Sequence, residues 1–518
     1  MRNLLCAALC TFLLVSLNAC TSNKIIRSTI AKSNSENCNF KGSADLAEFA
    51  KRGNDDCSRY SIEDHVDYTV AFVEFDDQGW LYDRAQMDLL MKELETQTKK
   101  DTEDLSIFVY VHGWKHNADF CDNNVCCFRE TLKQMHALED RYAKEYQWRK
   151  RKVFGIYVGW RGLSVMGPDV LRSTSFYSRK NAATRVALGS TRELLGKIKD
   201  FYERKNVKSG QQEKDRKDVK QLPLQTTGAD DTLRAGTRLL TMGHSFGGLV
   251  VYNAVAQALM ESAIEPEKYD QDQLVKPFGD LVFIVNPAFE GTRYEPLHQI
   301  AKRRQYPGYQ PPVFVAVTSA ADAATRVAFP IGRWVNGVWE QYSTGKDGGQ
   351  ISHTPEQQRD ANVKTIGHAE RYRTHRLEYT PSKAIEAKLE QKKSDAGKCS
   401  CPYKNGIENL LAGADIESEY GAWLDNLKNP QDWDLSTSAK KKHRVKGWTR
   451  KYSDESTLRH DPSDTQNSAD NPFWVVYTTK EIIPDHNGFY TPLFLNFVRH
   501  IYDDSLHLWG LQNKLKRR

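Results

Sequence analysis

A series of apolar runs, each bounded by residues typical of turns, constrains the fold of this chain more than any other feature. The runs are rich in β-branched and aromatic residues, and they are nearly continuous instead of alternating with polar residues. Strands buried on both faces of a parallel sheet have this composition, because helices cover both faces. The runs that we expect to form strands are 67–76, 105–113, 152–160, 237–245, 280–288, 312–320 and 472–479.

Segments with a helical spacing of apolar residues lie between these runs. The alternation of strand and helix predicts an α/β fold with a doubly wound, mostly parallel sheet and right-handed crossovers. The polar residues 205–231 interrupt the alternation, and we expect a mobile surface loop there. The expected helices include 81–99, 128–146, 179–205 and 249–263.

Composition divides the chain into segments. Residues 331–470 are polar, rich in Lys and Asp, and lie before the last expected strand. We interpret them as an insertion or cap and not as a second unit of the same kind. The expected segments are a signal peptide (1–19), a membrane tether (20–64), an α/β core (65–330), the insertion or cap (331–470), and a strand and helix that complete the core (471–518).

The N-terminal residues are expected to direct export. Arg2 precedes an apolar run from Leu4 to Leu17, and the tetrapeptide Leu17-Asn18-Ala19-Cys20 follows. A basic start, a short apolar run and a small residue at the cleavage position are typical of a secretory signal, and the run is too short to span a bilayer. The tetrapeptide resembles the lipobox of bacterial lipoproteins, which implies acylation of Cys20.

An aspartate directly after the acylated cysteine is associated with retention in the inner membrane. This chain has Thr21 at that position. We therefore expect a lipid-anchored protein of the bacterial cell envelope, on the periplasmic side of the outer membrane. A diacylglycerol and an amide-linked chain on Cys20 would anchor it firmly, because two acyl chains suffice where one is marginal.

The cysteine content agrees with an oxidising compartment. Of the 10 cysteines, Cys6 and Cys10 lie in the signal peptide and Cys20 is the expected lipid site. The rest are odd in number, so disulfides would leave at least one thiol unpaired. Their spacing does not suggest a metal site, and no metal or cofactor is expected. The cysteines outside the signal peptide and the lipid site are Cys38, Cys57, Cys121, Cys126, Cys127, Cys399 and Cys401.

The charge of the chain does not indicate a nucleic-acid partner. The net charge of +6 is distributed among 73 basic and 67 acidic residues. The densest basic runs, 213–220 and 439–446, lack the interleaved aromatic residues of a nucleic-acid surface. We interpret them as solvated faces.

A candidate nucleophile lies in residues 241–248, Thr-Met-Gly-His-Ser-Phe-Gly-Gly. A nucleophilic serine requires a tight turn from a strand to a helix, with small flanking residues that let the two backbones approach. An expected strand precedes Ser245 and an apolar helix follows it. Gly243, His244 and Gly247 would complete this nucleophile elbow.

A candidate oxyanion hole follows the expected strand 105–113. The glycine in His112-Gly113-Trp114 would let the backbone turn, so that the N–H of Trp114 points inward. With the N–H of Phe246, it would hold an oxyanion. The alternative is a turn at the end of a strand with a packed tryptophan.

A candidate acid and base follow the last two expected strands. Asp322 comes after the run 312–320, and His486 comes after the run 472–479 and before an apolar helix. The order Ser245, Asp322, His486 is the order of nucleophile, acid and base in α/β-hydrolases.

Alternatives to both assignments remain open. Asp322 could instead cap the helix that begins after it, which would leave Glu290 as the alternative acid. His368 and His375 compete with His486, but no expected strand precedes them, which favours a structural or cap role.

Residues 105–260 resemble the α/β-hydrolase superfamily, of the serine esterase and lipase type. The resemblance rests on Val111-His112-Gly113, Gly159-Trp160-Arg161-Gly162 and the run from Gly243 to Gly248. It implies hydrolysis of acyl esters through an acyl-enzyme, with no cofactor. Residues 331–470 depart from the family, in which lids more often follow the preceding strand, so no lid function is carried over.

The resulting hypothesis is a membrane-anchored serine hydrolase that cleaves carboxylic esters. Lipid esters are a candidate substrate class, because the anchor would hold the enzyme at a bilayer. One alternative is an inactive envelope lipoprotein that keeps the fold and acts as a binding or scaffold protein. Another is an amidase or thioesterase that uses the same triad.

Overall fold

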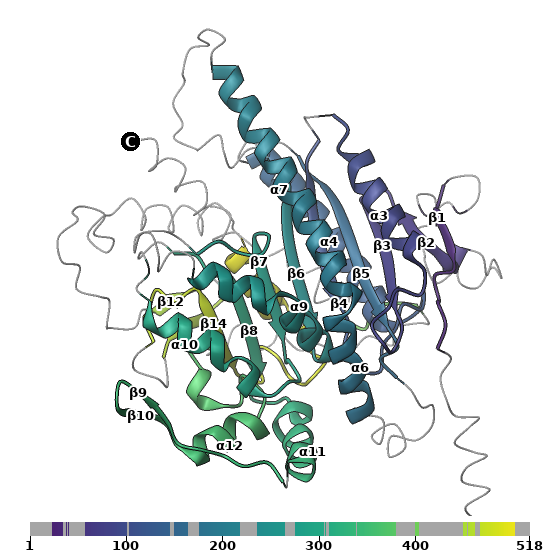
Figure 1. The fold of residues 1–518 in the computed structure, drawn as a ribbon. Coiled ribbons are helices and arrows are strands. Elements are labelled where there is room, and N and C mark those ends of the chain that lie inside the picture. Colours follow the sequence, from purple (N-terminus) through teal and green to yellow (C-terminus); the bar gives the residue numbers. More distant parts are fainter. Residues whose placement is uncertain are drawn as a thin grey trace, which may run out of the picture.

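The expected strands are neighbours in one sheet of the computed structural model (Figure 1). All of them pair in parallel, and nearly all of their residues are buried. The predicted α/β class with a mostly parallel sheet is therefore confirmed. The strands are β3 (Tyr68–Phe75), β4 (Leu105–Val111), β5 (Lys152–Trp160), β6 (Arg238–His244), β7 (Leu281–Val285), β8 (Phe314–Ser319) and β14 (Phe473–Thr478).

The sheet has 12 strands in the order β1-β2-β3-β5-β4-β6-β7-β8-β14-β11-β13-β12. The structure describes residues 23–34, 38, 40, 57–100, 103–145, 150–163, 176–217, 236–264, 275–304, 306, 310–337, 339–379, 399–403, 449–452, 454–461 and 467–502.

Helices cover both faces of the sheet and enclose a core on each side. Within β4, Val109 and Val111 face one core, whereas Phe108 and Tyr110 face the other. The first core is covered by α3 (Arg84–Gln97), α6 (Phe176–Leu188), α7 (Ser190–Lys217), α9 (Phe246–Ile264) and α10 (Glu295–Arg303). The second is covered by α4 (Asn123–Glu145) and a C-terminal helix described from 492 to 502.

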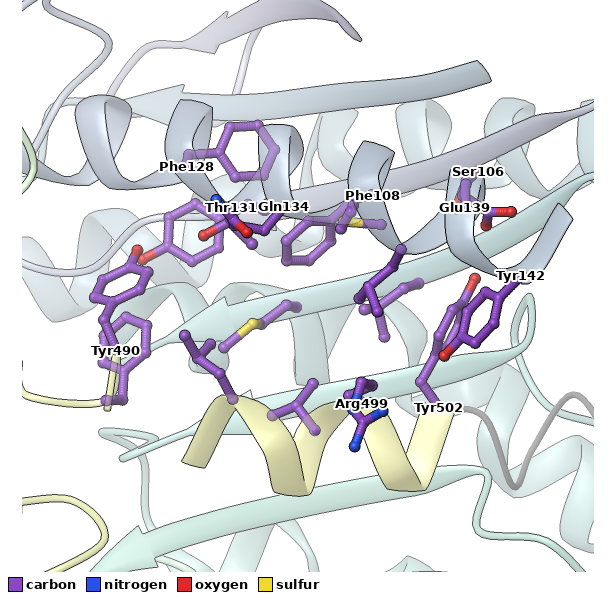
Figure 2. A pocket seen from close by; sticks show the side chains of 18 residues that line it. Ser106, Phe108, Phe128, Thr131, Gln134, Glu139, Tyr142, Tyr490, Arg499 and Tyr502 are labelled. Carbon is purple, nitrogen blue, oxygen red and sulfur yellow. The ribbon is translucent and has the colours of Figure 1, made fainter. Parts of the chain in front are cut away.

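An apolar groove lies on the second face, between α4 and the C-terminal helix (Figure 2). Side chains of β4 and β6 form its floor, including Phe108 and Met242. Phe489 and Tyr490 line the groove, as does Tyr502.

Part of the expected tether belongs to the folded body instead. β1 (Thr29–Lys32) pairs in parallel with β2 (Tyr60–Asp64), and β2 pairs antiparallel with β3. A disulfide joins Cys38 and Cys57. The expectation of a tether over 20–64 was therefore wrong for residues 23–34 and 57–64, because their polar composition includes charges that are buried as ion pairs.

The buried ion pairs centre on Glu63 of β2. Arg27 Nη1 donates to Glu63 Oε1 at 2.8 Å, and Arg129 of α4 donates to both carboxylate oxygens at 2.6 and 2.8 Å. The guanidinium of Arg27 also lies 3.7 Å from the ring centroid of Phe72. Burial alone would raise the pKa of Glu63, but Arg129 and Arg27 outweigh it and hold that pKa well below its ordinary value.

Part of the expected insertion extends the sheet beyond β14. β11 (His375–Tyr379) pairs in parallel with β14, and β13 (Ser456–His460) and β12 (Thr449–Lys451) follow antiparallel. Buried and more exposed residues alternate along β11 and β13, so these strands have a polar composition. Disulfides Cys121–Cys399 and Cys127–Cys401 attach this region near the start of α4, and Cys126 is a buried free thiol.

The remaining elements before β11 are short. They are α11 (Phe329–Asn336), α12 (Pro355–Val363), the hairpin β9 (Gly345–Asp347) and β10 (Gln350–His353), and the single turns η1 (Cys57–Arg59), η3 (Gly291–Arg293), η4 (Ala324–Ala328) and η5 (Glu370–Tyr372). The loop expected at 205–231 is helical up to Lys217, and its residues 218–231 lie outside the described residues.

We predict that Glu63→Gln destabilises the fold by about 3 kcal/mol, because it leaves two buried guanidinium groups without their shared carboxylate. The depressed pKa adds a pH dependence. The stability that Glu63 contributes is present above its unfolded pKa and is lost as the pH falls toward its folded pKa. Urea unfolding at pH 7 and at pH values below the unfolded pKa of Glu63 measures both effects. Glu193→Gln, which breaks an exposed pair with Arg84, is the control and should change little. Equal stability of the Glu63→Gln variant and the wild type would contradict the prediction.

Candidate active site

The candidate site lies at the point where the strand order reverses. The chain leaves β4 through α4 toward β5, and it leaves the adjacent strand β6 through α9 toward β7. Ligands of open α/β sheets bind in the crevice at the carboxyl ends of such strands. Gly113 follows β4 and Ser245 follows β6, so the two candidate turns meet at this crevice.

Glycines let these two turns approach each other. A Cβ on Gly247 would lie 2.0 Å from the carbonyl oxygen of Val111, and one on Gly243 would lie 2.5 Å from the carbonyl oxygen of Gly247. Between them, Ser245 has a φ of 57°, in the left-handed region that few non-glycine residues adopt. The sequence 243–247 thus forms the tight turn that the motif predicts, with His244 as the last residue of β6.

The structure brings the predicted nucleophile, base and acid together. His486 Nε2 lies 2.8 Å from Ser245 Oγ, and His486 Nδ1 lies 2.9 Å from Asp322 Oδ1. Asp322 is fully buried, whereas the His486 side chain is 18% exposed. A continuous chain of hydrogen bonds therefore connects the serine hydroxyl with a buried carboxylate.

The surroundings of Asp322 fix its charge and the tautomer of His486. Burial would raise the pKa of Asp322, but His486 and Thr325 outweigh it and lower that pKa below its ordinary value. An ionised carboxylate only accepts hydrogen bonds, so His486 Nδ1 carries a proton and donates it. Nε2 of the neutral imidazole is then the acceptor for the hydroxyl of Ser245.

Thr325 and His368 extend this chain beyond the acid. The Thr325 hydroxyl donates to Asp322 Oδ2, and its backbone N–H donates to Oδ1 at 3.1 Å. The hydroxyl has one proton, so it accepts from His368 Nε2, which lies 3.1 Å away. The predicted capping role of Asp322 and its predicted contact with the base thus occur together. His368 was expected to have a structural or cap role, and the structure places it three hydrogen bonds from His486, through Thr325 and Asp322.

Two side chains hold the backbone of the candidate base, a contact that sequence reasoning did not predict for His244 and a residue that it missed in Asn286. His244 Nε2 and Asn286 Nδ2 both donate to the carbonyl oxygen of His486, at 2.8 and 3.0 Å. Asn286 Oδ1 accepts from the N–H of Ser319 at 2.9 Å. The only sequence signal for Asn286 is its position, directly after the β7 run and before a proline.

His112 shapes the candidate oxyanion turn. Its Nε2 accepts from the N–H of Trp160 at 3.0 Å, so its Nδ1 carries the proton and donates to the carbonyl oxygen of Gly113 at 2.8 Å. Burial lowers the pKa of His112 to about 4, which keeps the ring neutral. A Cβ on Gly113 would lie 2.8 Å from the Cβ of Ser245. Trp114 thus follows a turn that touches the serine.

An aromatic wall continues from this turn. The ring of Phe176 packs edge-on against Trp114, with centroids 5.3 Å apart, and lies 4.8 Å from the ring of Phe246. Phe329 adds a further contact to Phe176 at 6.3 Å. The Nε1 of Trp114 is buried and has no hydrogen-bond partner among the described residues.

The alternative acid and one alternative base lie elsewhere. Glu290 is paired with Lys180 and with Arg293 and Arg333, at 3.0 and 3.3 Å. Burial would raise the pKa of Glu290, but its cationic partners, Lys180 first, lower it to about 2. His375 packs against Trp474, with ring centroids 4.4 Å apart. Cys20, the predicted lipid site, lies outside the described residues.

The apolar groove of Figure 2 is not the candidate site, because Ser245, Asp322 and His486 are absent from its lining. No family model, curated protein or solved structure matches this chain. Among the described residues, no helix is both long and apolar enough to cross a membrane.

We predict that Gly113→Ala destabilises the protein by about 1–3 kcal/mol, the usual cost of inserting a group into a packed site. The added methyl group would meet the Cβ of Ser245 at 2.8 Å and the carbonyl oxygen of His244 at 3.0 Å, neither of which is the end of a flexible side chain. Gly196→Ala in α7 is the matched control. Its Cβ would meet nothing within 4 Å, so it should stabilise by about 0.5–1 kcal/mol. Urea unfolding measures both, and a neutral Gly113→Ala would contradict the close approach.

Proposed function

We propose that this protein is a serine hydrolase of α/β-hydrolase fold that cleaves carboxylic esters through an acyl-enzyme. The proposal rests above all on the hydrogen-bonded series Ser245, His486 and Asp322 at the carboxyl edge of the sheet. A general base within 2.8 Å of a serine hydroxyl, oriented by a buried carboxylate, is the arrangement that activates a serine for attack.

In the proposed reaction, Ser245 Oγ attacks the ester carbonyl carbon while its proton passes to His486 Nε2. The carbon–oxygen bond to the alcohol then breaks, and His486 returns the proton to the departing alkoxide. A water molecule attacks the acyl-enzyme, gives a proton to His486 and releases the acid. Ser245 regains its proton from His486, and Asp322 stabilises the imidazolium at each transfer.

The negative charge that develops on the carbonyl oxygen needs donors beside Ser245. We assign this role to the backbone N–H groups of Trp114 and Phe246, which flank the close contact between Gly113 and Ser245. The half-buried rings of Trp114 and Phe176, which pack against the buried Phe246, favour an apolar acyl or alcohol group.

We predict that a fluorophosphonate probe labels the wild type at Ser245, because the serine oxygen would displace fluoride while His486 takes up the proton. Ser245→Ala should reduce labelling by at least about 10³-fold. Ser262→Ala, at a partly exposed serine bonded to the carbonyl oxygen of Lys276, is the matched control and should label like the wild type. Gel fluorescence and peptide mass spectrometry locate the adduct.

Equal labelling of the wild type and Ser245→Ala would reject the hydrolase and favour the binding or scaffold role. If Ser245 labels, the substrate class is open to a direct comparison. Rates on short and long acyl esters, amides and thioesters distinguish an esterase from an amidase or a thioesterase that uses the same triad.

We further propose that the protein is anchored to the bacterial outer membrane through acylated Cys20. The lipobox-like sequence 17–20 supports this proposal. The described fold begins close to the proposed anchor, since an extended chain spans at most about 3.5 Å per residue and Asn23 is therefore within about 10 Å of Cys20.

We predict that Cys20→Ser moves the protein from the membrane fraction to the soluble fraction after export. Acyl chains provide about 0.8 kcal/mol of binding per buried CH₂ group, so their loss should abolish stable attachment. Fractionation and intact-mass measurement report location and acylation, with Cys126→Ser, at the buried free thiol, as the control. Unchanged membrane attachment of Cys20→Ser would reject the anchor.

A further inference from the structure

Exposed apolar side chains gather at the edge of the sheet that carries the candidate active site. Trp80 lies in the turn after the carboxyl end of β3. Ile331 and Trp334 lie on α11, and Trp339 lies directly after it; this segment begins just past Asp322. All four side chains are more than half exposed. Apolar residues on one helix that are three or four positions apart share a face, so Ile331 and Trp334 form one stripe with Val327 of the preceding turn.

Helix α6 connects these residues into one surface. At its start, the hydroxyl of Tyr177 donates to the carbonyl oxygen of Phe329 at the beginning of α11, at 3.2 Å. At its end, the N–H of Ser190 donates to the carbonyl oxygen of Gly79 at 2.9 Å, next to Trp80. Leu188, the last residue of α6, is itself exposed. Figure 1 shows α6 and α11 at the same end of the molecule.

The N-terminal segment enters the fold at this same surface. The hydroxyl of Tyr82, two residues after Trp80, donates to Asn23 Oδ1. Arg27 N–H donates to Glu74 at the carboxyl end of β3, at 2.7 Å, and Arg27 Nε donates to the carbonyl oxygen of Ala118 in the loop after β4, at 2.8 Å. Cys20 lies only three residues before Asn23, within about 10 Å of it along an extended chain.

We infer that this surface, formed by Trp80, Leu188, Val327, Ile331, Trp334 and Trp339, rests on the lipid bilayer. We assign the bilayer to this surface because the N-terminal chain leads to it. Acyl chains on Cys20 would enter a bilayer beside Trp80. Tryptophan, like tyrosine, is enriched at the boundary between lipid and water. The inference rests on the proposed anchor, and it deepens the proposed function, since Ser245 would open toward esters held in the membrane.

The opposite edge of the sheet provides a matched control. Val66 precedes β3 and Ile264 ends α9, so both lie at the amino edge. Their exposed fractions, 69% and 46%, are close to the 62% and 57% of Ile331 and Trp334. The double variants Ile331→Asp/Trp334→Asp and Val66→Asp/Ile264→Asp therefore add the same charge at exposed sites on opposite edges.

The deciding experiment measures binding of the full-length Cys20→Ser protein to vesicles of phosphatidylethanolamine and phosphatidylglycerol. We expect the Ile331→Asp/Trp334→Asp change to lower the partition coefficient by at least about tenfold, because two apolar side chains no longer enter the lipid boundary. The Val66→Asp/Ile264→Asp change should leave it unaltered. Equal partitioning of all three proteins, or a loss confined to the amino-edge variant, would overturn the inference.

A second readout uses the acylated protein and separates this inference from the proposed function. The α11 double variant should hydrolyse an ester embedded in vesicles about tenfold more slowly than the wild type. Its rate on a water-soluble ester should be unchanged. Absence of any hydrolysis by the wild type would reject the hydrolase, while the vesicle partition would still decide whether the carboxyl edge contacts lipid. Equal loss on both esters would indicate a damaged active site and overturn the membrane contact as the cause.

Discussion

The structure of the candidate site depends on the close approach of two backbones at the carboxyl ends of β4 and β6. The Cα of Gly247 faces the carbonyl oxygen of Val111 so closely that a Cβ would lie 2.0 Å from it. No side chain separates the turn after β4 from the turn that opens α9. Because the two turns touch, the backbone at Gly113 lies against Ser245, whose Cβ would be 2.8 Å from a Cβ on that glycine.

Hydrogen bonds outside the turn stabilise its unfavourable conformation. A left-handed non-glycine residue such as Ser245 costs roughly 1–3 kcal/mol and persists only where its surroundings determine it. The N–H of Ser245 donates to the carbonyl oxygen of Val285 at 3.0 Å, and its own carbonyl oxygen accepts from the N–H of Ala288 at 3.1 Å. The neighbouring strand β7 and the loop after it therefore hold the candidate nucleophile Ser245, and Asn286 of the same loop holds the candidate base His486.

Sequence reasoning could predict the elements whose environment follows from local composition. Strands covered on both faces have continuous apolar sequences, so β3 to β8 and β14 were identifiable. Ser245, Asp322 and His486 could be assigned because each follows such a strand. β11 and β13 were not identifiable, because they are short and alternate buried and more exposed residues over only a few positions. The burial of Arg27 could not be predicted either, since its partner Glu63 is 36 positions away in the chain.

The two buried acids that were candidates for the same role differ in their ion-pair partners. Glu290 is paired with Lys180, Arg293 and Arg333, so its charge is already neutralised and could do little for a nearby imidazolium. Asp322 has no Lys or Arg partner among the described ion pairs, and it is paired only with His486. In the proposed reaction, its charge is left to stabilise His486 after that ring takes up the serine proton, because a buried, uncompensated carboxylate favours a protonated neighbour. Sequence position alone made both residues candidates, whereas the cations that surround one of them decide between the two.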